Sequence, residues 1–473
     1  MNRLSGLDAS FLYLESSTQP LHVCGVVMVS PSTMPEPYSF ESMKTEIDRR
    51  VRAMPDFRRS LRTVPLHLDH PVWVVDEEFD IDRHVHRLAV PAPGGEEELA
   101  EVVGHLAGIP LDRARPLWEM WVIEGLADGQ IAVLTKMHHA TVDGVSGSNL
   151  ISALCTLEPE APPVPEEEVQ TDRMPGDMEL IGRGVLSAVT KPIEFAKLVA
   201  PSAGIITNWI GRAREGKAMP APFTAPRTSF NATITGHRSA AFAEFDLADV
   251  KKVKNVTGST VNDVVLALVG GALRRYLEDR AELPASSLVA MVPVSVHSTS
   301  TRVGSNKVSG MFTKLYTDIE DPLERLEAIS ATNADVKEHH HAIDADTLQE
   351  WAQFAAPRTF GMAVRVYSRL RLAERHPVVH NLVVSNVPGP PMPMYFMGAK
   401  IEALYPLGPV FHGAGLNVTV MSSNGRMNVG LLACRELMPA VWDLAKDIPL
   451  ELETMLAALP VPNSRRSRGT SLK

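Results

Sequence analysis

Two adjacent histidines, His138 and His139, are the residues of this chain best suited to chemistry. They follow an apolar run at 131–137 and precede Asp143 and Gly144, which together give the pattern HHxxxDG. An imidazole has an unperturbed pKa of about 6.5, so a neutral base is available near physiological pH. Placing a His-His pair beside a hydrophobic strand is costly, because a buried imidazole must be hydrogen-bonded. The combination therefore favours a catalytic base over a simple turn or a structural histidine.

The elements around the pair would position one imidazole at a cleft. The run at 131–137 is rich in Ile, Val and Leu and alternates poorly, which is typical of a strand buried on both faces. Side chains alternate along a strand, so only one histidine can face a given cleft. We interpret His139 as the base and His138 as its neighbour on the opposite face, although alternation alone leaves the choice open. Asp143 would hold the loop, and Gly144 would supply a backbone conformation that a Cβ forbids.

A metal site is the weaker interpretation of the same motif. His139 and Asp143 have the i, i+4 spacing of zinc or iron ligands on a helix. Gly144 fits poorly inside a helix, however, and no third ligand stands at a recognisable spacing, so we expect no metal. The histidines at 339–341 lie in a charged stretch with helical character, and we interpret them as part of a solvent-exposed helix face. A metal-dependent hydrolase built on His138, His139 and Asp143 remains the less favoured alternative.

The motif also carries a family resemblance. HHxxxDG resembles the signature of the coenzyme-A-dependent acyltransferase superfamily, which includes chloramphenicol acetyltransferases and peptide-synthetase condensation domains. Further blocks resemble the bacterial wax ester synthase/diacylglycerol acyltransferase family from residue 4 to about residue 450. They are LSGLDASF at 4–11, RPLWE at 115–119, TVNDV at 260–264, GALR at 271–274, VPVS at 292–295 and SNVPGP at 385–390. One block departs from the family, because SNKVS at 305–309 has a serine where a glycine commonly precedes the asparagine.

The resemblance implies an α/β fold of two chloramphenicol-acetyltransferase-like domains. Each would be a mixed sheet with helices, and an active-site tunnel would lie at their interface. The implied reaction moves a long-chain fatty acyl group from acyl-CoA to the hydroxyl of diacylglycerol, giving triacylglycerol, or of a fatty alcohol, giving a wax ester. His139 would act as general base with no acyl-enzyme and no cofactor, since acyl-CoA is a substrate. A catalytically silent lipid-binding or condensation-like protein of the same fold is the other alternative.

Substrate contacts are expected mainly from the second half of the chain. Asn262 or a backbone N–H would stabilise the oxyanion of the reacting carbonyl. Thr260 and Asp263 also form a capping box, so Asn262 and Asp263 belong either to a helix cap or to the site. Asn306, in the block that departs from the family, and Trp118 complete the expected substrate-binding set.

Composition limits the class of protein. A chain of 473 residues is too long for one ordinary hydrophobic core, so two domains are expected. A composition of 45% hydrophobic and 22% charged residues is typical of a globular protein. The net charge of −10 argues against nucleic-acid binding, which needs a basic surface. Three widely separated cysteines suit a reducing compartment, and the first residues lack a signal-peptide pattern, so a cytoplasmic protein is expected.

Changes in composition along the chain suggest its domain organisation. A proline-rich, acidic stretch at 158–168 predicts an extended, exposed connector. We expect an N-terminal domain at 1–157, a connector with an amphipathic segment at 158–225, a C-terminal domain at 226–460 and a flexible tail at 461–473. The segment 178–216 carries too many charges to span a membrane. It would form helices packed on the body, or an interfacial surface resting peripherally on a membrane or lipid droplet.

Periodicity predicts several elements within these domains. Alternating or continuous apolar runs predict strands, and apolar residues at helical spacing predict helices. The predicted strands are 23–29, 72–75, 117–124, 288–296, 381–385 and a hairpin of 416–422 with 426–433 about Ser423-Asn424-Gly425; the predicted helices are 96–109 and 260–280.

Overall fold

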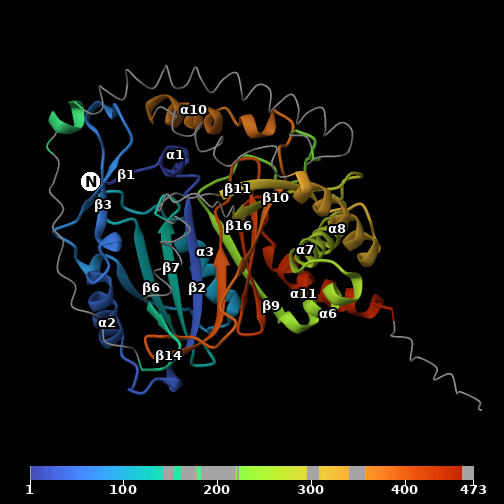
Figure 1. The fold of residues 1–473 in the computed structure, drawn as a ribbon, viewed down its shortest axis with the longest axis horizontal. Helices are drawn as coiled ribbons and strands as arrows, with labels where there is room; N and C mark the ends of the chain where they lie inside the picture. The colour runs from blue at the N-terminus through green and yellow to red at the C-terminus, as the bar shows by residue number, and fades with distance from the viewer. Residues whose placement is uncertain are drawn as a thin grey trace, which may run out of the picture.

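The computed structural model describes residues 2–141, 154–160, 176, 178–182, 220, 223–295, 308–339 and 357–460. Two mixed β-sheets stand side by side, with helices between them and on their outer faces (Figure 1). This is the α/β architecture that the sequence predicts, with two large mixed sheets.

The first sheet has seven strands in the order β5-β6-β7-β2-β14-β13-β8. β5 and β6 are parallel, and the other neighbours are antiparallel. Its strands are β2 (His22–Ser30), β5 (Val85–Ala89), β6 (Trp118–Glu124), β7 (Ile131–His138), β8 (Cys155–Thr156), β13 (Tyr395–Phe396) and β14 (Ala399–Leu407). A small sheet of β1 (Asn2–Arg3), β4 (Val72–Val75) and β3 (Arg59–Arg62) lies beside it (Figure 1).

The second sheet has six strands in the order β11-β10-β12-β15-β16-β9. Its central pairs, β10 with β12 and β12 with β15, are parallel, whereas the outer pairs are antiparallel. The strands are β9 (Arg238–Asp246), β10 (Val289–Ser295), β11 (Val308–Lys314), β12 (Leu382–Pro388), β15 (Leu416–Ser423) and β16 (Arg426–Cys434).

The helices cover the outer faces and fill the junction between the sheets. α6 (Leu247–Thr257), α7 (Val261–Glu278), α8 (Pro322–His339) and α11 (Val441–Ala458) pack on the second sheet, whereas α3 (Glu96–Gly108) lies between the first sheet and β9. α2 (Phe40–Arg52) lies on the outer side of the first sheet, and α10 (Pro357–Arg369) runs along the top above α1 (Gly6–Leu14) (Figure 1). Short 3₁₀ turns complete the chain: η1 (Pro31–Thr33), η2 (Pro55–Arg58), η3 (Pro65–His67), η4 (Ile81–Arg83) and η6 (Leu372–Glu374). Among the described residues no single helix is long and apolar enough to span a membrane, and the one pair that passes such a test jointly, α6 with α7, bends by 104°.

The predicted elements are confirmed, with end shifts of a few residues. All eight residues of β7 are buried, which explains why its apolar residues do not alternate with solvent-exposed polar ones. Thr260 caps α7 in a capping box with Asp263, and Asn424 and Gly425 make the turn between β15 and β16 with positive φ angles. Most of the segment 178–216, the connector at 161–175 and the tail at 461–473 lie outside the described residues.

The structure adds a crossover that the sequence prediction does not contain. β13 and β14 come from the second half of the chain but pair within the first sheet, where β14 lies against β2. The backbone of β14 also approaches the second sheet closely, because a Cβ at Gly430 of β16 would overlap the carbonyl oxygen of Pro406. This crossover joins the two halves into one body.

Candidate active site

The two histidines stand where β7 leaves the first sheet. His138 is its last residue, and its N–H donates to the Leu117 carbonyl at 3.0 Å. His139 follows, and its N–H donates to the Leu21 carbonyl at 2.8 Å. Leu117 and Leu21 directly precede β6 and β2, the two neighbours of β7. Both flanking strands therefore fix the backbone of the pair.

His138 faces the protein interior. Its side chain is fully buried, and its Nδ1 accepts a hydrogen bond from the Ala140 N–H at 3.0 Å. In the neutral ring this bond leaves the proton on Nε2, which lies 3.5 Å from Oε1 of Glu15. His138 is thus oriented from both sides of its ring and has no open face for a substrate.

Glu15, directly after α1, contacts several polar groups that lie behind the histidine pair. Its Oε1 lies 3.3 Å from Nε2 of His22 and accepts from the Leu21 N–H at 3.2 Å. Its Oε2 accepts from Nε and Nη2 of Arg113, at 3.0 and 2.6 Å. Burial alone would raise the pKa of this carboxyl, but the contacts with His138 and His22 and the charge of Arg113 outweigh it and hold the pKa well below its usual range. Glu15 is therefore an anion in the folded protein.

A buried lysine fixes the segment that carries Arg113. Lys136, inside β7, is fully buried, and its Nζ donates to the carbonyls of Leu106 and Ile109 at 3.2 and 2.9 Å. The same ammonium lies 3.0 Å from a carboxylate oxygen of Glu119. A cation at these carbonyls provides a hydrogen-bond donor to carbonyl groups at the C-terminal end of α3. It also interacts favourably with the negative end of the helix dipole. The chain beyond α3 is thereby held against the sheet.

His139 has different surroundings. Its partly exposed ring stacks on Phe11 of α1, with centroids 4.0 Å apart and planes inclined by 22°. Burial lowers its pKa to about 4; its own backbone carbonyl opposes the shift and the nearby His138 adds to it. Near pH 7 His139 is therefore a neutral imidazole with a lone pair available to accept a proton.

Asp263, predicted either as a substrate contact or as a helix cap, is a cap. Its buried carboxylate accepts from the N–H and hydroxyl of Thr260 at 2.9 and 2.8 Å. The other oxygen accepts from the Asn333 amide of α8 at 2.8 Å, whereas the Ser330 hydroxyl lies 3.4 Å from the oxygen that Thr260 contacts. We therefore correct the substrate-binding assignment, because the helix cap and α8 already use both oxygens.

Trp118 is a second correction, because its side chain belongs to the core. It is buried at the start of β6, and its Nε1–H donates to the Phe57 carbonyl at 2.8 Å. Its ring stacks on His84 with centroids 4.6 Å apart and lies beside Phe79. A side chain packed in this way is not exposed to a substrate.

The other predicted site residues divide into two groups. Asn262 is described and lies half-buried in the first turn of α7. Asp143, Gly144 and Asn306 fall outside the described residues, as do His340 and His341. Within the described ranges no group of three or more His, Cys, Asp or Glu side chains is arranged as a metal site.

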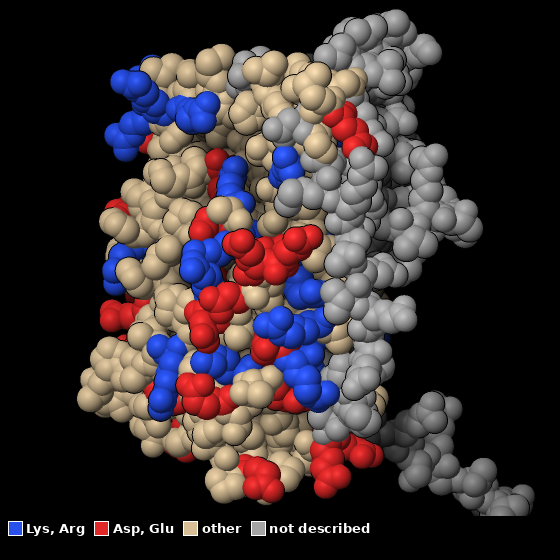
Figure 2. All heavy atoms as spheres, turned by 90° about the vertical axis from the view of Figure 1, so that its left-hand side faces the viewer, with Lys and Arg blue, Asp and Glu red and all other residues tan. Residues whose placement is uncertain are grey.

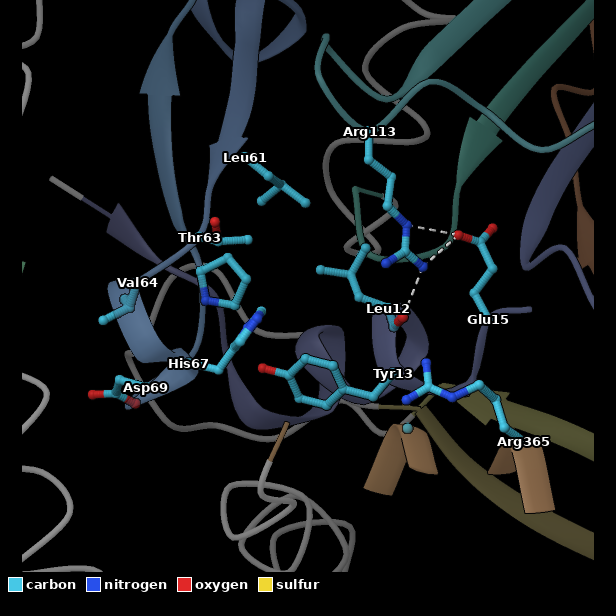
Figure 3. Close-up of a pocket in the computed structure, with 12 residues that line it drawn as sticks. Leu12, Tyr13, Glu15, Leu61, Thr63, Val64, His67, Asp69, Arg113 and Arg365 are labelled. Carbon is cyan, nitrogen blue, oxygen red and sulfur yellow. Dashed lines mark hydrogen bonds and ion pairs between the residues drawn. The ribbon is translucent and has the colours of Figure 1, made fainter. Parts of the chain in front are cut away.

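A cavity of about 290 Å³ borders this region between α1, the strand β3 and α10 (Figure 3). Glu15 and Arg113 form one side of it, and Leu12, Tyr13, Leu61 and Arg365 are among its other walls. Glu15, His22 and Arg113 are not among the predicted site residues. The only sequence signal for Glu15 is its charge directly after the apolar run at 11–14, and Arg113 lies 98 residues further along the chain.

Comparison with known proteins identifies the family of this chain. The sequence model of the wax ester synthase/diacylglycerol acyltransferase catalytic domain matches residues 4–265, and that of the WS/DGAT C-terminal domain matches residues 304–456. A Mycobacterium tuberculosis protein with the provisional name diacylglycerol O-acyltransferase is 45% identical over 458 residues, which cover 96% of this chain and 90% of that protein. A Mycobacterium bovis protein with the same provisional name is 34% identical, with 96% and 98% covered.

Solved structures define the fold class. The wax ester synthase/diacylglycerol acyltransferase from Marinobacter aquaeolei VT8 superposes with a TM-score of 0.68 at 30% identity and covers 96% of this chain and 98% of its own. The first condensation domain of the calcium-dependent antibiotic synthetase shares the fold at 13% identity, with a TM-score of 0.55 and 96% and 95% covered. The fold is that of a two-domain acyltransferase. Within that class, the chain belongs to the wax ester synthase/diacylglycerol acyltransferase family.

Proposed function

We propose that this acyltransferase moves a long-chain fatty acyl group from acyl-CoA to the hydroxyl of diacylglycerol, giving triacylglycerol. A fatty alcohol would be a second acceptor, giving a wax ester. The family and the names of the mycobacterial relatives and of the Marinobacter enzyme support these acceptors. Acyl-CoA serves as a substrate, and the proposed reaction uses no resident cofactor.

The single observation that carries the mechanism is the neutral, partly exposed imidazole of His139. It takes the proton from the acceptor hydroxyl while that oxygen attacks the thioester carbonyl. The new C–O bond forms, the C–S bond then breaks, and the departing thiolate of coenzyme A takes the proton back from His139. A neutral imidazole carries one ring proton, so its other ring nitrogen presents the accepting lone pair. No acyl-enzyme forms.

Other residues position this base. His138 and Glu15 hold the end of β7, and Asp143 is proposed to orient the following loop, with Gly144 permitting its backbone conformation. The Asn262 amide or a backbone N–H stabilises the oxyanion. The protein is proposed to act in the cytoplasm and to associate peripherally with the inner membrane face or lipid bodies, where its acceptors reside.

Replacing the base tests the proposal. We expect His139→Ala to lower kcat by roughly 100- to 10,000-fold, the usual contribution of a general base. The assay combines radiolabelled palmitoyl-CoA with a mixed pool of diacylglycerol and fatty alcohol acceptors and identifies the labelled products. His105→Ala, at an exposed position of α3, is the matched control and should keep full turnover.

Two results would reject the assignment. Unchanged turnover in His139→Ala, with an unchanged circular dichroism spectrum, would exclude this base. Absence of any acyl transfer by the wild-type protein would favour the catalytically silent lipid-binding alternative.

A further inference from the structure

α10 presents an apolar stripe to solvent. Met362, Val366 and Leu370 follow one another at four-residue spacing, so they lie along one side of the helix and its end. Their side chains are 57%, 47% and 49% exposed. A single exposed apolar residue is common on protein surfaces. Three such residues along one side of a helix form an apolar surface without a partner in the described structure.

The opposite side of α10 is already docked on the protein. The helix contacts α1, and a Cβ at Gly361 would lie 3.7 Å from the Tyr13 carbonyl oxygen. Tyr367 hydrogen-bonds through its hydroxyl to Nε2 of His376 at 2.5 Å. The stripe is therefore not the face that attaches the helix to its own body.

Arginines border the stripe. Arg365 and Arg369 follow Gly361 at four-residue spacing and are exposed along the border between the docked side of α10 and the stripe. Arg371 and Arg375 follow in the next turn, with Glu374 as the one acidic residue from 361 to 375. Within the described chain only Arg371 of this group has an ion pair, to Glu374 at 3.0 Å. In a protein with a net charge of −10, this is a local basic surface suited to an anionic partner.

Exposed apolar residues continue on the far side of the cavity beside Glu15. Gly361 and Arg365 of α10 line one side of that cavity, and Val64 and His67 of the η3 region line the other (Figure 3). Next to His67, Leu66 is 66% exposed and has a left-handed φ of 60°. Apolar side chains thus stand on both sides of the cavity.

The neighbouring face around α2 differs. Lysines and arginines there alternate with acidic residues, as Figure 2 shows. Examples are Lys44 with Asp82, Arg49 with Glu46 and Arg52 with Asp48. Such a surface of paired charges favours water, so an apolar partner is expected at α10 and not at α2.

We propose that α10 is a docking helix that lies in the surface of an anionic phospholipid bilayer. Met362, Val366 and Leu370 enter the boundary of the acyl chains, while Arg365 and Arg369 extend to the lipid phosphates. The inference deepens the proposed function, because it places the cavity beside Glu15 at the surface from which a lipid acceptor arrives. Binding is measured without turnover, so that the docking surface and the proposed reaction can fail separately.

Vesicle co-sedimentation of the full chain tests the proposal. The vesicles contain phosphatidylcholine alone, or phosphatidylcholine with about a third phosphatidylglycerol. We expect binding to the anionic vesicles and a loss of at least about tenfold in the partition coefficient for Val366→Ser/Leu370→Ser. Arg365→Gln/Arg369→Gln should lose about tenfold on anionic vesicles and little on neutral ones.

Matched controls are available at the opposite end of the molecule. Val256 of α6 and Leu450 of α11 are a valine and a leucine of similar exposure, distant from α10 (Figure 1). Val256→Ser/Leu450→Ser should bind vesicles as the wild type does, and so should Arg49→Gln/Arg52→Gln on α2. Circular dichroism and the urea midpoint confirm that each variant is folded.

Three outcomes would overturn the proposal. The wild type could fail to bind either vesicle, or the α10 variants could bind as well as their controls. The wild type could also form a dimer that Val366→Ser/Leu370→Ser converts to a monomer without any vesicle binding, which would assign the stripe to a second copy of the chain.

Discussion

His138 and His139 are neighbours in the sequence, but their rings meet different surroundings. His138 points into the body, between the Ala140 N–H and Glu15. His139 lies on Phe11 at the edge of the packed core, where burial keeps it neutral. His138 ends β7 and His139 begins the turn that follows, so their side chains leave the backbone in different directions. One imidazole orients the strand end, and the other is available for proton transfer.

The lowered pKa of His139 predicts an unusual pH profile. The base must be neutral, and a pKa of about 4 keeps it neutral at every pH above that value. We therefore expect kcat/KM to be nearly constant between about pH 5 and 8 and to fall only at lower pH. Initial rates, taken together with the urea midpoint at each pH, measure this. An acid limb near 6.5 would show that burial does not control this histidine.

Glu15→Gln removes the charge that connects His138, His22 and Arg113. We expect kcat to fall roughly 10- to 100-fold, because the strand end carrying the base loses its position. Stability at pH 7 should fall by about 1–3 kcal/mol. The folded-state pKa of Glu15 lies below its usual 4.5, so its stabilisation is present above that pH and is lost on acidification. The Gln variant should accordingly lose less stability than the wild type below about pH 4.5.

Urea unfolding at several pH values measures both effects of Glu15→Gln. The exposed Glu36→Gln serves as control and should change neither turnover nor stability. A Glu15→Gln protein with full activity would reduce Glu15 to a structural ion pair.

Among the elements, α7 carries in its first turn a stabilising residue, Asp263, directly after a candidate catalytic residue, Asn262. Its capping box is local, since Thr260 and Asp263 are three residues apart. The bond from Asn333 to Asp263 is not local, because it joins α7 to α8 across 70 residues. The start of α7 is therefore held by two contacts of different range, and Asn262 lies between them.

Asp263→Ala and Asn262→Ala should therefore have opposite effects. Without the Asp263 carboxylate the cap is lost and the Asn333 amide is unpaired, so we expect a loss of about 1–3 kcal/mol in stability and unchanged turnover per folded molecule. Asn262→Ala should keep its stability but lose on the order of 100-fold in kcat if its amide supports the oxyanion. Urea midpoints and active-site-normalised rates separate the two. Equal turnover in both variants would assign the oxyanion to backbone N–H groups.

For the molecule as a whole, the contact between the two sheets decides whether both halves form one active body. β14 pairs with β2 in the first sheet while its Pro406 carbonyl lies against Gly430 of the second. α3 also approaches β9 closely, because a Cβ at Gly104 would lie 2.7 Å from the Arg238 carbonyl oxygen. Glycine permits these backbone approaches, and any side chain would force the sheets apart.

Gly430→Ala tests this junction. The added methyl group overlaps the Pro406 carbonyl, so we expect a stability loss of about 1–3 kcal/mol and reduced turnover as the sheets shift. Gly310→Ala in β11 is the control, because its Cβ would lie 3.7 Å from its nearest neighbour and should be tolerated. Thermal unfolding and acyl-transfer rates of both variants provide the comparison. A neutral Gly430→Ala would mean that the sheets adjust to each other without cost.

The sequence by itself determined the histidine motif, the α/β class, the family and most strands and helices. These features rest on short-range patterns: the apolar run of β7, the capping box of α7 and the Asn-Gly turn before β16. Tertiary structure alone decided that Glu15 meets His138, that Trp118 belongs to the core and that β14 crosses into the first sheet. Such contacts join residues tens to hundreds of positions apart. They depend on strand order and packing, which local periodicity does not encode.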